Sequence, residues 1–347
     1  MRNLYKIAAL LVFLGGMVVV WAGSEYLNFA QTPIKVSAQG YVYELKPGFT
    51  LTYVARQLAK DGVISNAKYL VWVARLSGRA NDIKTGEYLL TADMKPSELL
   101  DKINQGGSIQ YGFTVIEGWT TEQLIAAVRK DKNLLHVTVG LSNKEIMSKL
   151  GLADLHPEGQ FLPDTYHFPR GTSDLDFLRR ANHALHTFLT EQWEKRDVGL
   201  PYKSPYEALI MASIVEKETG AAHERAQIAG VFIRRLEKRM RLQTDPTVIY
   251  GLGKSYKGNI KRRHLKQDTP YNTYTRFGLP PTPIALPGRD AILAALHPAD
   301  GDSLYFVSRG DGTHKFTSNL RDHNNAVIKY QLKGKRRAFS SMKNAKR

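Results

Sequence analysis

The sequence predicts an α+β protein with one membrane-spanning helix at its N-terminus. Strand-like and helix-like stretches follow one another in mixed order, without the regular alternation that is typical of a parallel sheet. The 347 residues are enough for two domains, and the chain contains no internal repeat of the solenoid type. Sixteen consecutive residues near the start carry no charge, which sets them apart from the rest of the chain.

The uncharged stretch within residues 7–24 predicts the membrane helix. Its length is about the minimum needed to cross a bilayer. Arg2 and Lys6 precede it and Glu25 follows it, a charge pattern that places the N-terminus in the cytoplasm. We therefore expect residues 1–6 to be cytoplasmic, one pass through the inner membrane, and a periplasmic body.

A cleaved signal peptide is the alternative reading of this N-terminus. Val20-Trp-Ala22 resembles a signal-peptidase site. With either an anchor or a cleaved signal, the chain from about Ser24 onward lies outside the cytoplasm.

Composition restricts the chemistry and the partners. The chain has no cysteine, which excludes disulfides, thiolate metal sites and cysteine nucleophiles. It has 49 Lys and Arg against 32 Asp and Glu, a net charge of +17 that favours an anionic neighbour. Export makes nucleic acid a poor candidate. Part of the charge lies in the tail 333–347, which we expect to be disordered, and part in Lys261–His264, which we expect in a loop.

A small mixed subdomain is predicted after a linker at residues 25–39. Four elements follow that linker in β-α-α-β order: a strand at Tyr41–Leu45, a helix capped by Thr50, a helix at Asn66–Leu76 and a strand at Gly86–Leu90. This order resembles the LysM module, a carbohydrate-binding fold of the cell wall, and a generic α+β subdomain is the alternative. We assign residues 40–110, with a further helix at Pro96–Gln105, to this LysM-like subdomain.

Residues 111–332 predict a larger mixed α+β domain. Its expected helices are Thr120 or Thr121 to Val128, Leu141–Leu152, Asp174–Arg196, Ser204–Thr219, His223–Met240, Asp290–Leu296 and one starting near Asn319. Its expected strands are Ile109–Ile116, part of Glu158–Phe168, and Ser303–Val307 before an Asp311-Gly312 turn. Much of the chain beyond Met240 is expected to form turns, including Gln243–Pro246.

The segment Ser204–Gly220 is predicted to be one helix with clear ends. Ser204 is the expected N-cap, Pro205 fits the first helical position, and Glu207 completes a capping box. Gly220 is the expected stop.

Glu218 lies where the apolar stripe of this helix continues. Met211, Ile214 and Val215 share its face, whereas Glu216 points well away from them. A carboxyl group on a buried face has a raised pKa, which suits a general acid near neutral pH. The alternative is that Glu218, in the last turn, frays into water.

Other common catalytic signatures are absent. The sequence contains no Walker phosphate loop, no HExxH and no G-x-S-x-G elbow. His183 and His186 share a helix face without a third ligand at metal spacing, so we interpret them as surface or packing residues. We expect neither a metal nor a cofactor.

Polar and aromatic side chains are interleaved, mostly in the turns after Glu218. The polar residues are Gln243, Thr244, Asp245, Tyr271, Asn272, Thr273, Tyr274, Asn319 and Asn324, and the aromatic ones include Trp119, Phe161, Tyr166, Tyr250 and Phe277. Rings beside hydroxyl and amide groups suit a sugar, which has flat C–H faces and rims of hydroxyls. Turn formation and core packing are the alternative explanation for each residue taken alone.

Several long stretches resemble the MltG/YceG-like family of endolytic murein transglycosylases. They are Glu117–Trp119, Glu158–Phe168, Met211–Thr219, Arg241–Gly251, Tyr271–Tyr274, Gly278–Pro281 and His297-Pro298. In that family the second glutamate of the E-K-E triplet is catalytic, which corresponds to Glu218. The helical position of Glu218 selects the same residue independently.

The resemblance implies cleavage of peptidoglycan between N-acetylmuramic acid and N-acetylglucosamine within glycan strands. The product carries a 1,6-anhydro end, and the cut limits strand elongation. We expect Glu218 to be catalytic, and eight residues to bind substrate: Gln243, Thr244, Asp245, Tyr271, Asn272, Tyr274, Asn319 and Tyr166. Asp245 is either a second acting carboxylate or an orienting or turn residue.

A non-catalytic scaffold is the alternative function. Such a protein would bind peptidoglycan through the LysM-like portion and recruit wall-synthesis enzymes, which are expected partners in either case. Whichever function holds, we expect the positive surface to meet anionic phospholipid heads near the anchor, or the carboxylates of wall peptides, in place of nucleic acid.

Overall fold

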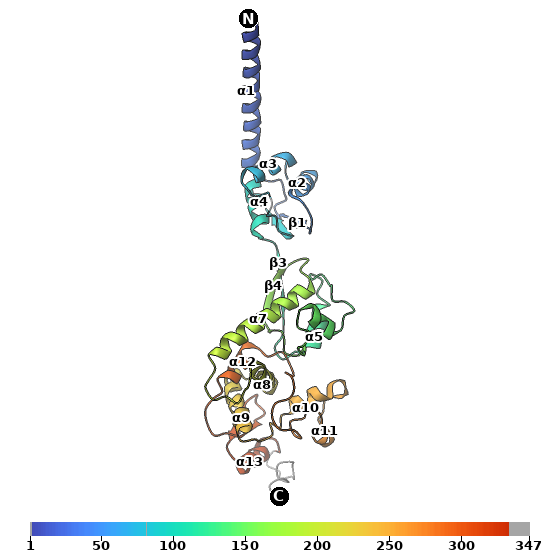
Figure 1. Cartoon of the computed structure of the whole chain (residues 1–347), viewed down its shortest axis with the longest axis vertical. Coiled ribbons are helices and arrows are strands. Elements are labelled where there is room, and N and C mark those ends of the chain that lie inside the picture. The colour runs from blue at the N-terminus through green and yellow to red at the C-terminus, as the bar shows by residue number, and fades with distance from the viewer. Residues whose placement is uncertain (1, 81, 333–347) are drawn as a thin grey trace. The chain divides into compact units, whose positions relative to one another are not determined.

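The computed structural model describes residues 2–80 and 82–332, and the chain divides into two compact units. The first contains the chain up to Gly112 together with 167–172, and the second contains 113–166 and the chain from Ser173 onward. Helices and short strands occur in mixed order in both units (Figure 1), so the α+β prediction is confirmed.

The first helix is longer than the sequence predicted. Helix α1 runs from Arg2 to Gln31, so part of the expected linker 25–39 is helical. Residues 24–31 contain no helix breaker, Phe29 packs against Tyr69 with ring centroids 5.6 Å apart, and the helix stops only before Pro33. By length and composition, the segment Ala9–Gln31 could cross a membrane, and its apolar window is not buried in the protein.

The β-α-α-β order predicted for the first unit is present. It consists of β1 (Tyr41–Leu45), α2 (Leu51–Lys60), α3 (Ala67–Leu76) and β2 (Gly86–Leu90), and α4 (Pro96–Gln105) follows. The strands pair antiparallel, with Tyr43 opposite Tyr88, and both of these rings are buried against the helices. Thr50 caps α2 at Tyr53 N (3.3 Å), as predicted, and Asn66, which was predicted as the first residue of the next helix, caps α3 at Lys68 N (2.9 Å).

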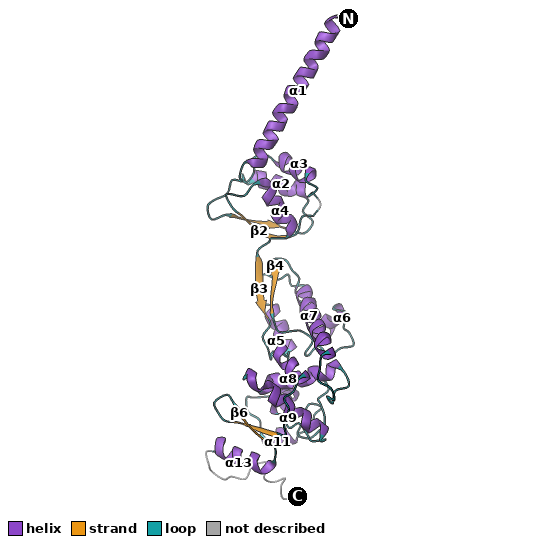
Figure 2. Ribbon diagram, turned by 90° about the vertical axis from the view of Figure 1, so that its left-hand side faces the viewer, coloured by secondary structure: helices purple, strands orange, loops and turns teal. Residues whose placement is uncertain are grey.

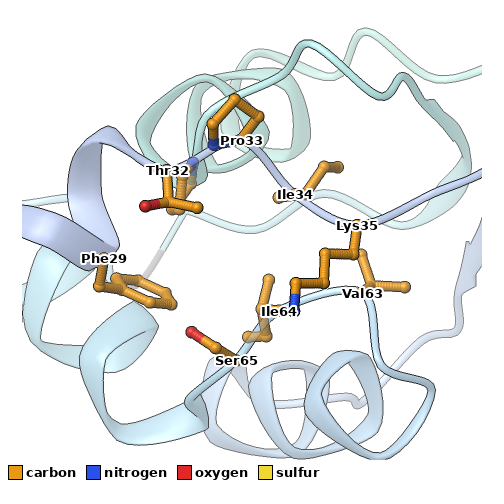
Figure 3. Close-up of a pocket in the computed structure, with 9 residues that line it drawn as sticks. Phe29, Thr32, Pro33, Ile34, Lys35, Val63, Ile64 and Ser65 are labelled. Atoms are coloured by element: carbon orange, nitrogen blue, oxygen red, sulfur yellow. The ribbon is translucent and has the colours of Figure 1, made fainter.

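A small cavity lies in this unit beside the end of α1 (Figure 3). Its volume is about 20 Å³, and Phe29, Ile34, Val63 and Ile64 supply most of its apolar wall. That space holds roughly one water molecule. The cavity is therefore too small to hold a sugar ring.

The second unit contains most of the helices (Figure 2). Strands β3 (Gln110–Thr114) and β4 (Thr165–Pro169) pair where the two units divide. The remaining elements are α5 (Thr121–Val128), α6 (Asn143–Lys149), α7 (Asp174–Glu194), α8 (Pro205–Glu218), the 3₁₀ turn η1 (Ala222–Glu224), α9 (Arg225–Glu237), α10 (Asp245–Leu252), η2 (Gly253–Ser255), α11 (Arg262–Lys266), α12 (Arg289–Leu296), β5 (Tyr305–Ser308), β6 (His314–Thr317) and α13 (Leu320–Tyr330).

Helix α8 forms the centre of this unit. It contacts α7, α9, α10 and α12, and all residues from Ala208 to Val215 are buried. The helix is thus apolar on every side rather than along one stripe. Both carboxylates of its last turn, Glu216 and Glu218, therefore lie close to the protein interior.

Helix α8 begins as predicted, with Ser204 at the N-cap position and Pro205 in its first turn, but the contacts at its two ends differ from the prediction. Ser204 makes no side-chain capping bond, and Glu207 accepts instead from the backbone N–H of Lys203 at 2.6 Å. Thr219 follows the helix in extended conformation, so the chain leaves α8 without using a left-handed glycine at Gly220. The capping-box prediction is wrong because the Glu207 carboxylate bonds the Lys203 N–H instead of the N-cap backbone. The glycine-stop prediction is wrong because the helix ends at Glu218 and Gly220 is not in the left-handed conformation.

The longer elements of the second unit that were not predicted are α10, α11 and β6. Helix α10 begins at the Asp245-Pro246 pair that was interpreted as a turn, because proline is tolerated in a first helical turn. The short helix α11 lies in the expected basic loop. Strand β6 pairs antiparallel with β5, with Phe306 opposite Phe316. The predicted tail 333–347 lies outside the described residues.

Candidate active site

Glu218 is the last residue of α8, and its side chain is partly buried. The Thr244 hydroxyl donates a hydrogen bond to its Oε1. The pKa of Glu218 is raised to about 7, chiefly because the group is buried. The hydrogen bond from Thr244 lowers this pKa, and the nearby charge of Asp245 raises it. His314 and Arg235 also act to lower it. A carboxyl group that titrates near pH 7 can both donate and accept a proton under neutral conditions.

The chain around Thr244 is held by the turn 271–274. The Thr244 N–H donates to the Thr273 hydroxyl at 3.1 Å, and the Gln243 N–H donates to the Thr273 carbonyl at 3.2 Å. Gln243 has a positive φ of 50°, which turns the chain sharply just before Thr244. The hydroxyl of Tyr274 donates to Asp245 at 2.6 Å. The fold thus brings together Gln243, Thr244, Asp245 and Tyr274 beside Glu218.

The other four predicted binding residues use their polar atoms elsewhere in the protein. Asn272 is buried, and its amide donates to the carbonyls of His264 (3.1 Å) and Gln267 (2.6 Å). The Tyr271 hydroxyl pairs with Thr282 at 2.9 Å. Asn319 caps α13, and the buried Tyr166 donates to the Leu162 carbonyl at 2.8 Å. These contacts do not place Asn319 or Tyr166 at Glu218.

Glu224 and His314 form a buried pair that the sequence did not reveal. One Glu224 oxygen accepts from the His314 backbone N–H at 2.8 Å, and the other lies 2.7 Å from His314 Nδ1. Glu224 follows Glu218 by only six residues, so the pair ties the start of β6 to the loop after α8. No local sequence pattern links two residues 90 positions apart. The short distance in sequence between Glu224 and Glu218 could have indicated that Glu224 lies near the site.

Arg235 supports the same region from α9. Its guanidinium is buried and donates to the carbonyls of Leu242 (2.6 Å) and Leu304 (2.7 Å). These bonds fix the chain just before Thr244 against the approach to β5. Burial lowers the pKa of Arg235, whereas Glu218 and the neighbouring tyrosines oppose that change.

Glu216 belongs to a separate charge cluster. Its side chain is 7% exposed, accepts from the Gly288 N–H at 3.0 Å and lies 3.8 Å from Arg225. Burial raises the pKa of Glu216. Arg225 also contacts Glu117 at 3.4 Å and Asp290 at 3.1 Å. This cluster holds the last turn of α8 in place while leaving Glu218 available on another side.

Another buried carboxyl group, Glu158, was also missed as a candidate. It accepts from the Thr121 N–H at 2.9 Å and from the Tyr250 hydroxyl at 3.1 Å. Burial raises its pKa. Its bonds join the start of α5 to the last turns of α10, which indicates a supporting role for the helix that begins beside Glu218.

A model of the YceG-like family matches residues 43–329. The chain belongs to this family. The matched range contains every residue described above around Glu218, and the resemblance predicted from the sequence is confirmed. Among residues 2–80 and 82–332, no group of three or more His, Asp or Glu side chains is arranged to hold a metal ion.

Similar proteins include curated members with a stated activity. An endolytic murein transglycosylase of Bacillus subtilis (strain 168) is 31% identical over 312 residues, with 82% of both chains covered. One of Streptococcus pneumoniae serotype 2 is 26% identical, and the alignment covers 89% of this chain but 62% of that relative. A solved structure of a YceG-like protein from Listeria monocytogenes is 29% identical, with 83% of this chain and 99% of that chain covered and a TM-score of 0.49.

Proposed function

We propose that this YceG-like protein is an endolytic murein transglycosylase, a lyase that cuts glycan strands within peptidoglycan and so limits their elongation. The observation that carries the proposal is Glu218, whose partly buried carboxyl group has a pKa of about 7. The names of the Bacillus and Streptococcus relatives support the same activity.

In the proposed reaction, one carboxyl group performs both proton transfers. Protonated Glu218 gives its proton to the glycosidic oxygen that leaves C1 of N-acetylmuramic acid. The resulting carboxylate takes the proton from the C6 hydroxyl of the same sugar, and that oxygen closes onto C1. The product is a 1,6-anhydro sugar and no water is consumed. Because the nucleophile belongs to the substrate, proximity replaces the second carboxylate that a hydrolase uses.

The neighbours of Glu218 suggest how the strand is held. We propose that Gln243, Thr244, Asp245 and Tyr274 face the sugars, with Asp245 oriented by the Tyr274 hydroxyl at 2.6 Å. Binding of substrate by Tyr271, Asn272, Asn319 and Tyr166 stays a prediction.

We further propose the organisation of the whole chain around this site. Residues 7–24 within α1 anchor the protein in the inner membrane with the N-terminus in the cytoplasm, and a cleaved signal is the alternative. Residues 40–110 act as a LysM-like glycan-binding subdomain, and 111–332 form the catalytic domain. Wall-synthesis enzymes are the proposed protein partners.

The ends of the released glycans test the proposal. Purified protein incubated with peptidoglycan is expected to release fragments with 1,6-anhydromuramic ends, each 18 Da lighter than a hydrolysed fragment because one water is not added. Mass spectrometry of the soluble products measures this. Reducing ends would contradict the one-carboxylate mechanism. Binding of peptidoglycan without any released fragment would favour the scaffold function.

Replacing Thr244 with valine is expected to move the pH profile of kcat/KM. The lost hydrogen bond favoured the ionised form of Glu218, so its pKa rises above 7 and the acid stays protonated to higher pH. The alkaline limb of the profile should shift to higher pH by about one unit, because one pKa unit corresponds to roughly the free energy of one hydrogen bond to a charged group. Thr244→Ser keeps the hydroxyl and is the matched control. An alkaline limb that moves down or stays in place in the valine variant would contradict this assignment.

A further inference from the structure

Residues 254–266, called here the basic segment, carry unneutralised positive charge close to the active site. The segment contains six Lys or Arg residues, one histidine and no acidic residue. All six cations are exposed. Lys254 lies 3.7 Å from Glu122, and no other ion pair to the segment occurs among residues 2–80 and 82–332. A surface with this much positive charge favours an anionic ligand.

The basic segment is attached to the loops that hold Thr244 and Asp245. The Asn272 amide group donates to the carbonyls of His264 and Gln267, at the end of the segment and just beyond it. The Asn272 side-chain oxygen accepts from the Tyr274 N–H at 2.9 Å, and Tyr274 in turn bonds Asp245. One buried asparagine thus links the cations to the neighbours of Glu218.

Helix α10 sets the spacing between the cations and the acid. Its first residue, Asp245, follows the Thr244 that bonds Glu218, and its last, Leu252, is two residues from Lys254. Eight helical residues span about 12 Å. Helices α10 and α11 contact each other and lie together in Figure 1. Helix α10 therefore separates the start of the basic segment from the residue that bonds Glu218 by about its own length.

We propose that the basic segment binds carboxylates of the stem peptides that project from the glycan strand, and so selects strands whose stem peptides are negatively charged. This inference rests on the proposed function. A glycan backbone alone offers hydroxyl and acetamido groups, which do not require a cluster of cations. Stem peptides present free carboxylates at repeated positions away from the sugars, which matches exposed cations set back from the acid.

The test compares cleavage of glycan strands whose stem peptides carry free carboxylates with cleavage of the same strands after those carboxylates are neutralised. Intact peptidoglycan is one substrate, and the same material with its free carboxylates converted to amides is the other. Wild-type full-length protein in neutral detergent is expected to cut intact strands with a kcat/KM about tenfold higher, the combined effect of several weak exposed ion pairs. The triple variant Lys257→Gln, Lys261→Gln, Arg262→Gln should lose this preference, mainly through KM.

A matched triple variant controls for the change in net charge. Lys130→Gln, Lys132→Gln, Lys144→Gln removes three exposed cations from elsewhere in the second unit and should keep the wild-type preference. Equal cleavage of both substrates by the wild type would overturn the inference and leave the proposed function standing. Cleavage of neither would instead count against the proposed function.

A lipid surface is the competing ligand, and the same assay separates it. If amidation has no effect but an anionic phospholipid added to the detergent micelles inhibits the wild type and spares the Lys257, Lys261, Arg262 variant, the basic segment meets lipid and the proposal is wrong.

Discussion

Replacing Glu218 with glutamine is expected to lower kcat for glycan cleavage by about a thousandfold or more, in the upper range for loss of a general acid and base. The amide has nearly the same shape and can still accept the Thr244 hydrogen bond, but its N–H protons are not acidic and cannot be transferred to the glycosidic oxygen. The measurement is the rate of release of soluble fragments from purified peptidoglycan. Glu216→Gln changes the other carboxylate of the same helical turn and is expected to keep most of the activity.

The stability of the Glu218→Gln protein separates lost chemistry from lost folding. A carboxyl group with a pKa of about 7 when folded, against 4.5 as its ordinary value, binds a proton more tightly in the folded state. The contribution of Glu218 to the free energy of unfolding of the wild type therefore falls as pH rises from about 4.5 to 7. Glutamine avoids that cost, so above pH 7 the variant should be more stable by up to about 3 kcal/mol. A variant that is less stable at pH 8 would show that Glu218 is not held in a costly ionised state.

The sequence predicted those site residues whose position follows from their neighbours in the chain, and it did not predict contacts between distant residues. Glu218 was identified because its position in one helix and its place in a recognised stretch agreed. Thr244 and Asp245 were predicted to lie near it, although Asp245-Pro246 was interpreted as a turn and begins α10 instead. The pairing of Glu224 with His314 was not predictable, since a contact across 90 residues leaves no trace in helical or strand periodicity.

The secondary-structure predictions also succeeded mainly where the signal came from neighbouring residues. The cap at Thr50 was predicted from the sequence because a cap needs only a few neighbouring residues. Ser204 occupies the predicted N-cap position, but the predicted capping box is wrong because the Ser204 side chain makes no capping bond and the Glu207 carboxylate bonds Lys203 instead. Strand β6 was missed for another reason: its four residues are too few for a clear alternation, and its pairing with β5 defines it.

Replacing Arg225 with methionine is expected to lower the free energy of unfolding by about 3 kcal/mol at pH 8, the cost of breaking a buried ion pair by removing one partner. The guanidinium lies within 3.8 Å of three carboxylates, and the Glu216 side chain among them is only 7% exposed. Without Arg225 that carboxylate stays buried near Glu117 and loses its ion-pair partner, and only the charge of Lys217 still favours its ionised form. Denaturant unfolding followed by circular dichroism measures the loss.

The loss should depend on pH in a direction that identifies Glu216 as its source. Burial raises the pKa of Glu216 and Arg225 lowers it, so removing Arg225 raises it further. A carboxyl group whose folded pKa is raised loses stability as pH rises through that pKa, so the deficit should be smaller at pH 5 than at pH 8. Adding Glu216→Gln should restore part of the stability, whereas Asp290→Asn should not, because Asp290 is 66% exposed. A deficit that is equal at both pH values and insensitive to Glu216→Gln would mean that Arg225 stabilises α8 through packing alone.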